Sequence, residues 1–562
     1  MKDLFLFTIG PVKEFIGSSR KLVDLYGGSR LLSDLMGRAV CQLNKVENVK
    51  ILIPYVPDFC KNESPNMPNR MVAEFADYSE DEKRRIAENL TDFVKQEFER
   101  TALELLESKG ISRSGIEMAK KQWEDFLEIY WVFEAYDSPG YWEAYQRMIG
   151  AIHQVKGIRP FSQTTEPWGR KCMLFPKYNG IFAKKSGKGN ENAYPYQTNP
   201  CYVCDITESH GLEYMVKPGE ALSALALMKR IYGKRDTDLY SVRYMLLAQR
   251  VPENLFRESG MEGQKHERRD MLANAVYDLD HGVVLDEEEY DAQVIQMAHH
   301  LYRRIVEQGV KLSSYYAVLK FDGDNMGDAF KALEEAEKQR ELSKNIHSFA
   351  EEVPAIIKKF GGLPVFAGGE DFLGFIPLDH LFECVSVLHE SFCQIMKRSF
   401  SIGITIAHLM QPLKEVMAGV DAMEESAKRM PGKNAFAIGI IKRSGDEVRM
   451  PAYKLSGGEG VPQWKDVRWL VGILSRAQCS KSMFFNMAQL MKPFLGEQVK
   501  PQDDMVEILL RKCVKHGKLE VEQVGVEEVV ERLMLFYKNG NQIEDFLHTT
   551  DGIAFLSREV DG

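Results

Sequence analysis

The sequence predicts an α+β fold in which a sheet with carboxylates at its strand ends is covered by helices on one face. Two observations predict it. Apolar runs of strand length alternate with longer amphipathic runs between residues 315 and 441, and two acidic turns that contain glycine adjoin such runs. At 562 residues the chain is also too long for one core, so its length suggests about three or four domains.

The two acidic turns follow strand-like segments that are close in the chain. Residues 315–321 are typical of a buried strand and lead into Asp322-Gly323-Asp324-Asn325-Met326-Gly327. Residues 363–367 and 372–376 are typical of the two arms of a hairpin, with Gly368-Gly369-Glu370-Asp371 at its tip. The sequence therefore predicts that both sets of carboxylates lie at the ends of neighbouring strands.

The other elements of this region follow in an order that identifies an architecture. The patterns predict helices over 329–338 and near 346–360, a helix over 378–397, a strand over 400–408, a helix over 413–430 and a strand over 435–441. The resulting order, β-α-α-β-β-α-β-α-β, is that of the palm domain of polymerases and nucleotide cyclases, a ferredoxin-like sheet.

The acidic turns have the composition of a two-metal nucleotidyl site. Hard cations such as Mg²⁺ take oxygen ligands, usually one or two protein carboxylates together with the phosphates of a substrate. Asp322, Glu370 and Asp371 would meet that need, and Gly368 and Gly369 would let phosphate oxygens approach backbone N–H groups. The alternative is structural, because Gly and Asp are also ordinary turn residues.

The start of the chain repeats the strand-turn-helix order without the acids. Residues 4–9 are predicted to form a strand, Gly10-Pro11 a turn and residues 12–24 a helix. We interpret this segment as a degenerate copy of the palm that packs against the catalytic one and holds a second nucleotide but no metal. The alternative is two unrelated strand-helix units.

Composition excludes several classes of protein. Hydrophobic residues make up 44% of the chain and charged residues 27%, and no stretch approaches the ~18 uncharged apolar residues of a membrane span. The net charge of −10 does not indicate a general nucleic-acid binder. Nine thinly spread cysteines favour reduced thiols, and the first residues lack a signal peptide, so we expect a cytoplasmic protein without membrane contact.

Several motifs between residues 4 and 445 resemble those of a known family. Ile9-Gly10-Pro11-Val12-Lys13-Glu14-Phe15-Ile16, Ser19-Arg20-Lys21 and Met67-Pro68-Asn69-Arg70 resemble the opening of the large subunit of type III-B (Cmr) CRISPR effector complexes. The strand before Asp322, the Gly368-Gly369 hairpin and Lys442-Arg443-Ser444-Gly445 resemble the same family, in the same order.

The resemblance implies an RNA-guided surveillance complex whose large subunit makes cyclic oligoadenylates from ATP when target RNA is bound. It implies that Asp322, Glu370 and Asp371 hold Mg²⁺ or Mn²⁺. The nucleotide contacts that we expect are Gly323, Asp324, Asn325, Gly368, Gly369, Lys433, Ser33 and Arg70. The implied partners are the backbone, small helical and guide 5′-end-binding Cmr subunits, CRISPR RNA and target RNA.

The sequence departs from the family in two ways that bear on activity. The family usually has Gly-Gly-Asp-Asp where this chain has Glu370, and some members join AMP to S-adenosylmethionine, so the acceptor stays open between ATP and S-adenosylmethionine. Many relatives begin with an HD nuclease domain, whereas none of the 12 histidines here precedes Asp and none occurs before His153. We therefore expect no HD-type DNase activity.

Four domains are expected from these patterns. They are a degenerate palm with a helical insertion (1–155), a Cys-containing and helical domain (156–310), the catalytic palm (311–445) and a C-terminal helical bundle (446–562) that begins with a linker over 445–463. Two other functions are alternatives. A stand-alone diguanylate cyclase would not need the degenerate palm, and a non-catalytic scaffold would not need the intact acids.

The Cys-containing insert raises the question of zinc. Relatives carry a Cys-rich zinc site there, and this chain offers Cys172, Cys201, Cys204 and His210, with Phe175 where a second CxxC would end. A Cys₃His site, a partial site and buried structural thiols remain alternatives.

We predict at most one zinc per chain, bound near Cys201 and Cys204, because only three thiols and one histidine are available as ligands. Elemental analysis of chain purified without added zinc tests this. Two or more zinc ions per chain would contradict it.

Overall fold

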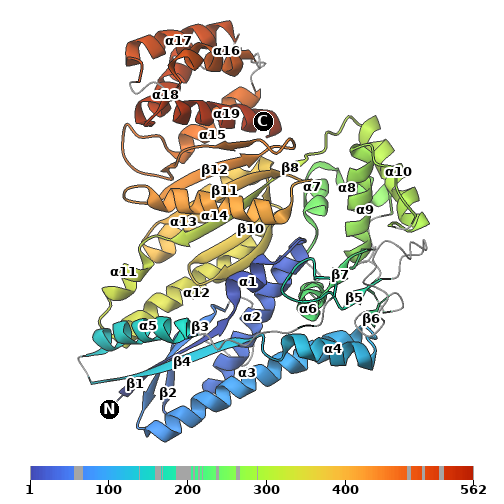
Figure 1. Cartoon of the computed structure of the whole chain (residues 1–562). Helices are drawn as coiled ribbons and strands as arrows, with labels where there is room; N and C mark the ends of the chain where they lie inside the picture. Colours follow the sequence, from blue (N-terminus) through green and yellow to red (C-terminus); the bar gives the residue numbers. More distant parts are fainter. Residues whose placement is uncertain are drawn as a thin grey trace.

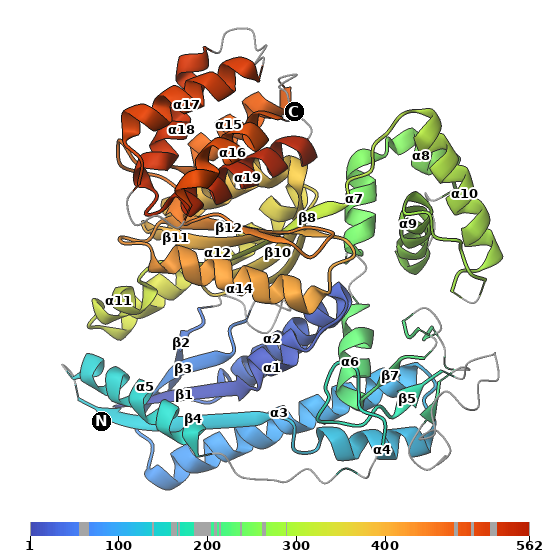
Figure 2. The same cartoon turned by 45° about the horizontal axis from the view of Figure 1, so that its top comes forward.

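The computed structural model describes most of the chain. The described residues are 2–55, 67–137, 140–158, 166, 169–184, 204–206, 209, 211–212, 215–217, 219–235, 239–260, 266–287, 289–476, 482–495, 500–517 and 525–560. Two sheets lie one above the other, with a helical bundle beyond the second sheet and a helical region beside both (Figures 1 and 2). Within the described residues, no helix is long and apolar enough to cross a membrane.

The larger sheet contains the predicted palm and confirms the α+β fold. Its order is β13-β12-β11-β8-β10-β9, with β14 paired to β12. The strands are β8 (Tyr315–Gly323), β9 (Leu363–Gly368), β10 (Asp371–Pro377), β11 (Phe400–His408), β12 (Ala435–Ile441), β13 (Glu447–Arg449) and β14 (Tyr453–Lys454). β8 is antiparallel to both β10 and β11, and β12 runs parallel to β11.

Helices cover both faces of this sheet, whereas the sequence pattern predicted one covered face. Ala317, Leu319 and Phe321 of β8 pack in one core with α12 (Ala336–Lys359) and α13 (Leu381–Met396). Val318, on the other face, belongs to a core with α14 (Leu413–Arg429). Two short helices, α11 (Met326–Lys331) and η1 (Leu378–His380), complete the region.

The N-terminal sheet has the order β2-β3-β1-β4. Its elements are β1 (Lys2–Gly10), β2 (Val49–Ile53), β3 (Arg70–Ala76), β4 (Glu128–Tyr136), α1 (Val12–Gly17), α2 (Leu22–Leu43), α3 (Glu80–Ser108), α4 (Arg113–Trp123) and α5 (Tyr141–Gly157). The single helix predicted over 12–24 is wrong: two helices form, with a break over 18–21. The Lys229 ammonium accounts for the break, because it donates to the carbonyls of Phe15 and Ser18.

A small sheet and five helices follow the N-terminal sheet. They are β5 (Phe182–Ala183), β6 (Cys204–Asp205), β7 (Ala221–Leu222), α6 (Ala224–Gly233), α7 (Val242–Arg250), α8 (Glu253–Glu258), α9 (His266–Asp280) and α10 (Ala292–Glu307). The small sheet has the order β6-β5-β7. Helix α6 packs along α2 and ties this region to the N-terminal sheet.

The chain ends in the predicted helical region. Its helices are α15 (Trp464–Arg476), α16 (Ser482–Met491), η2 (Lys492–Phe494), α17 (Asp503–His516), α18 (Val526–Asn539) and α19 (Ile543–Glu559). The linker predicted over 445–463 is wrong in part. β13 and β14 lie within it and extend the sheet by pairing with β12, because the apolar side chains of Val448 and Tyr453 are buried there.

The two sheets meet along helix α12. The Tyr141 hydroxyl donates to Gln339 Oε1 over 2.7 Å, and the backbone N–H of Tyr55 donates to Ser343 Oγ over 2.8 Å. Lys50 of β2 pairs with Glu337 at the start of α12. These contacts fix the edge of the N-terminal sheet beside the hairpin that carries Glu370 and Asp371.

A buried ion cluster joins α2 to α6. The Arg230 guanidinium, 1% exposed, forms two hydrogen bonds with the Asp24 carboxylate, at 2.8 and 3.1 Å, and a third with Glu220 at 2.7 Å. The two-pronged geometry compensates the loss of hydration that both charges undergo.

We predict that Asp24→Ala lowers the midpoint of thermal unfolding strongly, because it leaves the Arg230 charge buried without its main partner, at a cost of about 3–5 kcal/mol. Arg84→Ala is the control. Its pair with Glu88 is exposed, so its loss should change the midpoint little. Equal shifts in the two variants would contradict the prediction.

Candidate functional site

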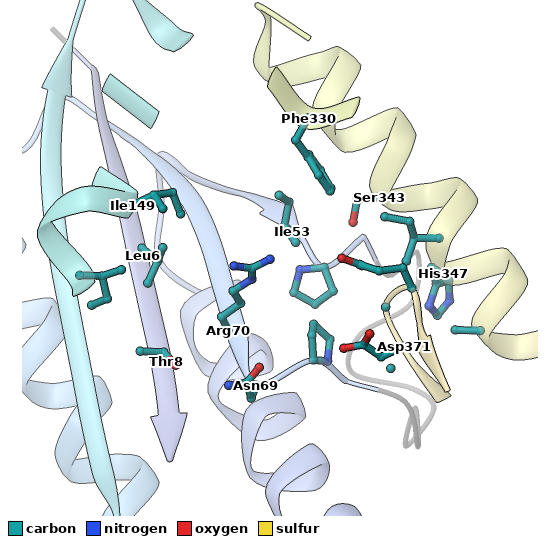
Figure 3. Close-up of a pocket in the computed structure, with 18 of the residues that line it drawn as sticks. Leu6, Thr8, Ile53, Asn69, Arg70, Ile149, Phe330, Ser343, His347 and Asp371 are labelled. Carbon is teal, nitrogen blue, oxygen red and sulfur yellow. The ribbon is translucent and has the colours of Figure 1, made fainter. Parts of the chain in front are cut away.

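A cavity of about 280 Å³ lies between the N-terminal sheet and the β9–β10 hairpin. Arg70 of β3 and Asp371 of β10 enter it from opposite walls (Figure 3). Its other polar lining residues are Thr8, Asn69, Tyr145, His153, Lys156, Ser343, His347 and Glu370, drawn from both sheets and from α5 and α12. Because neither sheet forms the cavity alone, a bound molecule would contact both halves of the chain.

Strand register brings the predicted carboxylates together. Phe321 of β8 pairs with Phe372 of β10, so Asp322 and Asp371, the next residues outward, lie side by side. Burial, a hydrogen bond with Asp322 and the charge of Asp322 raise the pKa of Asp371. Burial and then Asp322 also raise the pKa of Glu370. The three acids therefore form a cluster whose mutual repulsion a cation would relieve.

One lysine partly neutralises this cluster. Lys428 Nζ of α14 lies 2.5 Å from Asp322 Oδ2 and 2.7 Å from Glu424 Oε1. Burial alone would lower the pKa of Lys428, but hydrogen bonds to Asp322 and Glu424 raise it. Lys320 pairs with the same Glu424 at 2.8 Å. The ammonium of Lys428 thus takes the place beside Asp322 that a bound cation would take.

The opposite wall of the cavity is cationic. Burial and then the charge of Arg70 lower the pKa of Lys156, which donates to Thr8 Oγ1 over 3.2 Å. Arg70 also acts on Glu370, whose pKa it lowers against the effect of burial. The cavity is therefore polarised, with acids on the hairpin side and bases on the N-terminal side.

The two hairpin glycines are required for different structural reasons. A Cβ at Gly368 would lie 2.4 Å from the Phe366 ring. Gly369 has a φ of +71°, a left-handed conformation that a side chain would strain, although a Cβ there would meet no atom within 4 Å. The close hairpin turn, which holds Glu370 at the cavity wall, depends on both.

The other predicted nucleotide contacts occupy different places. Gly323 ends β8, and the exposed Asn325 adopts a left-handed φ of +56° at the start of α11. Asp324 points into the protein, where its carboxylate accepts bonds from Ser399 and Ser401. Lys433 is half-buried in the turn before β12.

Ser33 lies outside the cavity lining. Its side chain is buried, and its hydroxyl accepts a 2.7 Å bond from the backbone N–H of Met67. This bond fixes the chain just before Pro68, Asn69 and Arg70, which do line the cavity. The structure therefore places Ser33 behind the cationic wall.

The predicted zinc ligands are only partly within the described residues. Cys172 and Cys204 are both buried, whereas Cys201 and His210 lie outside the described residues. Cys172 Sγ accepts bonds of 3.4 Å from the N–H groups of Leu174 and Phe175. In the described part of the chain, no group of three or more His, Cys, Asp or Glu side chains is arranged to hold a metal ion.

Several residues of the cavity and the acidic cluster were not among the predicted site residues, including Lys428, Lys156 and Tyr145. Lys428 carried one available signal, since it follows Glu424 by four residues on a predicted helix and precedes the Gly432-Lys433 turn. Lys156 and Tyr145, both on α5, carried none, because their helix gave no indication that it packs beside the cavity.

Two family models match parts of the chain. A family model described as Cas10/Cmr2, second palm domain, matches residues 315–437, and one described as CRISPR-associated protein Cmr2, N-terminal, matches residues 4–107. The CRISPR system Cmr subunit Cmr2 of Pyrococcus furiosus is 21% identical over 551 residues, covering 79% of this chain and 62% of that protein. The chain thus spans less than two thirds of that relative.

Two solved structures share the fold. A chain of a type III-B Cmr-beta complex in the apo state aligns with a TM-score of 0.67 and 12% identity, over 99% of this chain and 82% of the other. A chain of type III-B Cmr-beta bound to cognate target RNA aligns with a TM-score of 0.64 and 12% identity, over 99% and 83%.

We predict that the metal-free chain loses stability as pH rises from the ordinary Asp value of 3.8 towards about 8. A raised pKa means that the folded state binds more protons than the unfolded state in this window, so the unfolding free energy falls as pH rises. Surrounding protein atoms crowd the Asp371 carboxyl, but solvent still reaches the residue at the cavity wall and screens part of the effect.

Thermal unfolding midpoints in EDTA, at about pH 6 and about pH 8, test this prediction. The decrease should be smaller in Asp371→Asn, and Mn²⁺ should offset it in the wild type. A decrease as large in Asp371→Asn as in the wild type would contradict it.

Proposed function

We propose that the chain is a member of the Cas10/Cmr2 family of CRISPR-associated proteins and the large subunit of a type III-B complex that joins nucleotides at the cavity between its two sheets. The reaction is nucleotidyl transfer from ATP. A ribose 3′-oxygen of the acceptor forms a bond to the α-phosphorus of ATP, the bond to the bridging oxygen breaks, and pyrophosphate leaves. The hydroxyl proton is released to solvent.

One observation carries the proposal: Glu370 and Asp371 face a cationic wall across one cavity, and the strand register places Asp322 of β8 beside Asp371. Carboxylate oxygens suit hard divalent cations, and the raised pKa values of Glu370 and Asp371 reflect repulsion that such cations relieve. In the described structure these three acids are not arranged as a metal site, because Lys428 pairs with Asp322. With a triphosphate bound, Asp322, Glu370 and Asp371 would hold Mg²⁺ or Mn²⁺, which would lower the pKa of the attacking hydroxyl and neutralise the triphosphate.

Lys428 and the cationic wall have separate roles in this proposal. Once cations occupy the acids, the Lys428 ammonium is free to pair with the triphosphate of the donor. Arg70 and Lys156 bind the anionic groups of the acceptor from the N-terminal side. The wall therefore favours ATP, with its triphosphate, over S-adenosylmethionine, whose sulfonium centre is positive.

The product that follows is an oligoadenylate, released as a diffusible messenger, with cyclisation as the last transfer. The proposed partners are other Cmr subunits, CRISPR RNA and target RNA. The support is the similarity to a solved type III-B chain whose complex is bound to cognate target RNA. The N-terminal sheet supplies the acceptor wall within the same chain, so the arrangement does not require the homodimer of a stand-alone diguanylate cyclase.

We predict that the assembled complex, given ATP, Mn²⁺ and target RNA, forms adenylate products and that Asp322→Ala abolishes them, by at least ~10²-fold, because the acid at the end of β8 is lost. Glu370→Ala with Asp371→Ala should behave in the same way. Asp446→Ala is the control, since Asp446 is exposed beyond the far end of β12. Mass spectrometry identifies the products.

S-adenosylmethionine is included in a parallel reaction with wild-type complex. A product with the mass of an S-adenosylmethionine adduct would overturn the acceptor assignment while leaving nucleotidyl transfer intact. Full turnover by the Asp322→Ala complex would overturn the site itself.

A further inference from the structure

We infer that His389 and Asp324 are positioning residues that hold the Gly432-Lys433-Asn434 turn, named here the 432–434 turn, against the acidic end of β8. The inference rests on the proposed function and on the sequence-based expectation that Lys433 contacts the nucleotide. It gives Asp324 a structural role instead of the predicted nucleotide contact. It also assigns a role to His389, which is not one of the predicted site residues.

The 432–434 turn needs external support. Gly432, Lys433 and Asn434 have φ values of 72°, 50° and 50°, so three consecutive residues are left-handed and two of them carry a side chain. Such a conformation is unfavourable for each residue that carries a side chain. Contacts from neighbouring elements must therefore offset the strain.

Asn434 is the point at which those contacts meet. Its carbonyl accepts from Leu455 N over 2.8 Å, and its side-chain Nδ2 donates to the carbonyl and hydroxyl of Ser456 over 3.0 and 3.1 Å. Its Oδ1 lies 2.8 Å from His389 Nε2 of α13. Because Nδ2 is the donor to Ser456, Oδ1 faces His389 and the imidazole donates.

Asp324 links the same turn to the catalytic strand. Its Oδ2 accepts from the backbone N–H of Asn434 over 2.8 Å and from Ser399 Oγ over 2.7 Å. Its Oδ1 accepts from Ser401 Oγ over 2.7 Å. Asp324 is 5% exposed and follows Asp322 by two residues, so one buried carboxylate joins the end of β8, the start of β11 and the 432–434 turn.

The imidazole of His389 is suited to a fixed donor role. Burial lowers its pKa, so the ring is neutral at neutral pH and carries a single N–H. The hydrogen bond to Asn434 fixes that hydrogen on Nε2, and the Cys393 thiol, 3.6 Å from the same nitrogen, is a weaker acceptor. Without this bond, Asn434 keeps its other contacts but its side chain loses one of two anchors.

Loss of the His389 hydrogen bond should weaken nucleotide binding and leave the chemical step nearly unchanged. A relaxed 432–434 turn misplaces Lys433 while leaving Asp322, Glu370 and Asp371 on their strands. We expect His389→Ala to raise the KM for ATP about five- to tenfold, the effect of one lost hydrogen bond, with kcat within about twofold. His389→Gln, whose amide N–H can replace the donor, should restore KM.

The test uses the assembled complex with Mn²⁺ and target RNA, and measures kcat and KM for each variant. Ser386→Ala is the matched control on α13, because the Ser386 hydroxyl bonds only within its helix, to the Phe382 carbonyl at 2.9 Å, in the described structure. If His389→Ala does not fold, His389→Leu replaces it, since Leu fills the space but has no donor. A KM unchanged in the Ala or Leu variant, or raised equally in the Gln variant, would overturn the inference.

Amide hydrogen exchange separates this inference from the proposed function. The Asn434 amide, bonded to Asp324, should exchange faster in His389→Ala than in wild type or Ser386→Ala, whether or not the complex makes a product. A wild-type complex with no adenylate product would refute the proposed function, and the exchange rate would then decide the positioning role alone. Equal exchange in all variants would overturn it.

Discussion

The antiparallel register of β8 and β10 is the constraint on which the site depends. It places the carboxyl groups of Asp322 and Asp371 side by side, although their like charges repel each other. Lys428, which approaches from α14, moderates that repulsion. The tight glycine hairpin adds to the repulsion, because it holds Glu370 beside the other two acids. A helix on each face of the sheet then fixes the strand ends that carry the acids.

The second requirement is the partner sheet. β1 and β3 of the N-terminal sheet carry Thr8 and Arg70, and α5 adds Lys156, so this half brings positive charge to the cavity. Contacts along α12, from Tyr141 and Tyr55, determine how far the two walls stand from each other. The acids and the bases therefore reach the same cavity only through the packing of elements that are far apart in the chain.

The sequence predicted the strands of the catalytic palm well because each is a continuous apolar run with a clear end. β11 and β12 have the predicted bounds, and the acids lie at strand ends as expected. Turns were less predictable. The break after α1 depends on Lys229, which lies more than two hundred residues away, and no local pattern reports such a contact.

Other differences have related causes. Residues 445–463 are rich in glycine, which is typical of a linker. Two short strands within this range, β13 and β14, nevertheless pair with β12. Asp324 is a carboxylate of the kind that binds metals or nucleotides, but it points inward. Ser401 of the neighbouring strand β11 and Ser399 just before it donate hydrogen bonds to its carboxylate. Lys428 and Lys156 became recognisable only when their helices were placed, because a charged residue on an amphipathic helix is usually a solvated one.

The presence of two unlike sheets in one polypeptide has an evolutionary consequence. In a homodimer, a two-fold axis would present every substitution twice, so an arginine that improves one wall would also appear beside the acids of the other. A single chain removes this restriction. Position 70 can be basic and the Gly10-Pro11 turn can lack acids independently of the Gly368-Gly369 hairpin, so each half can differ from the other.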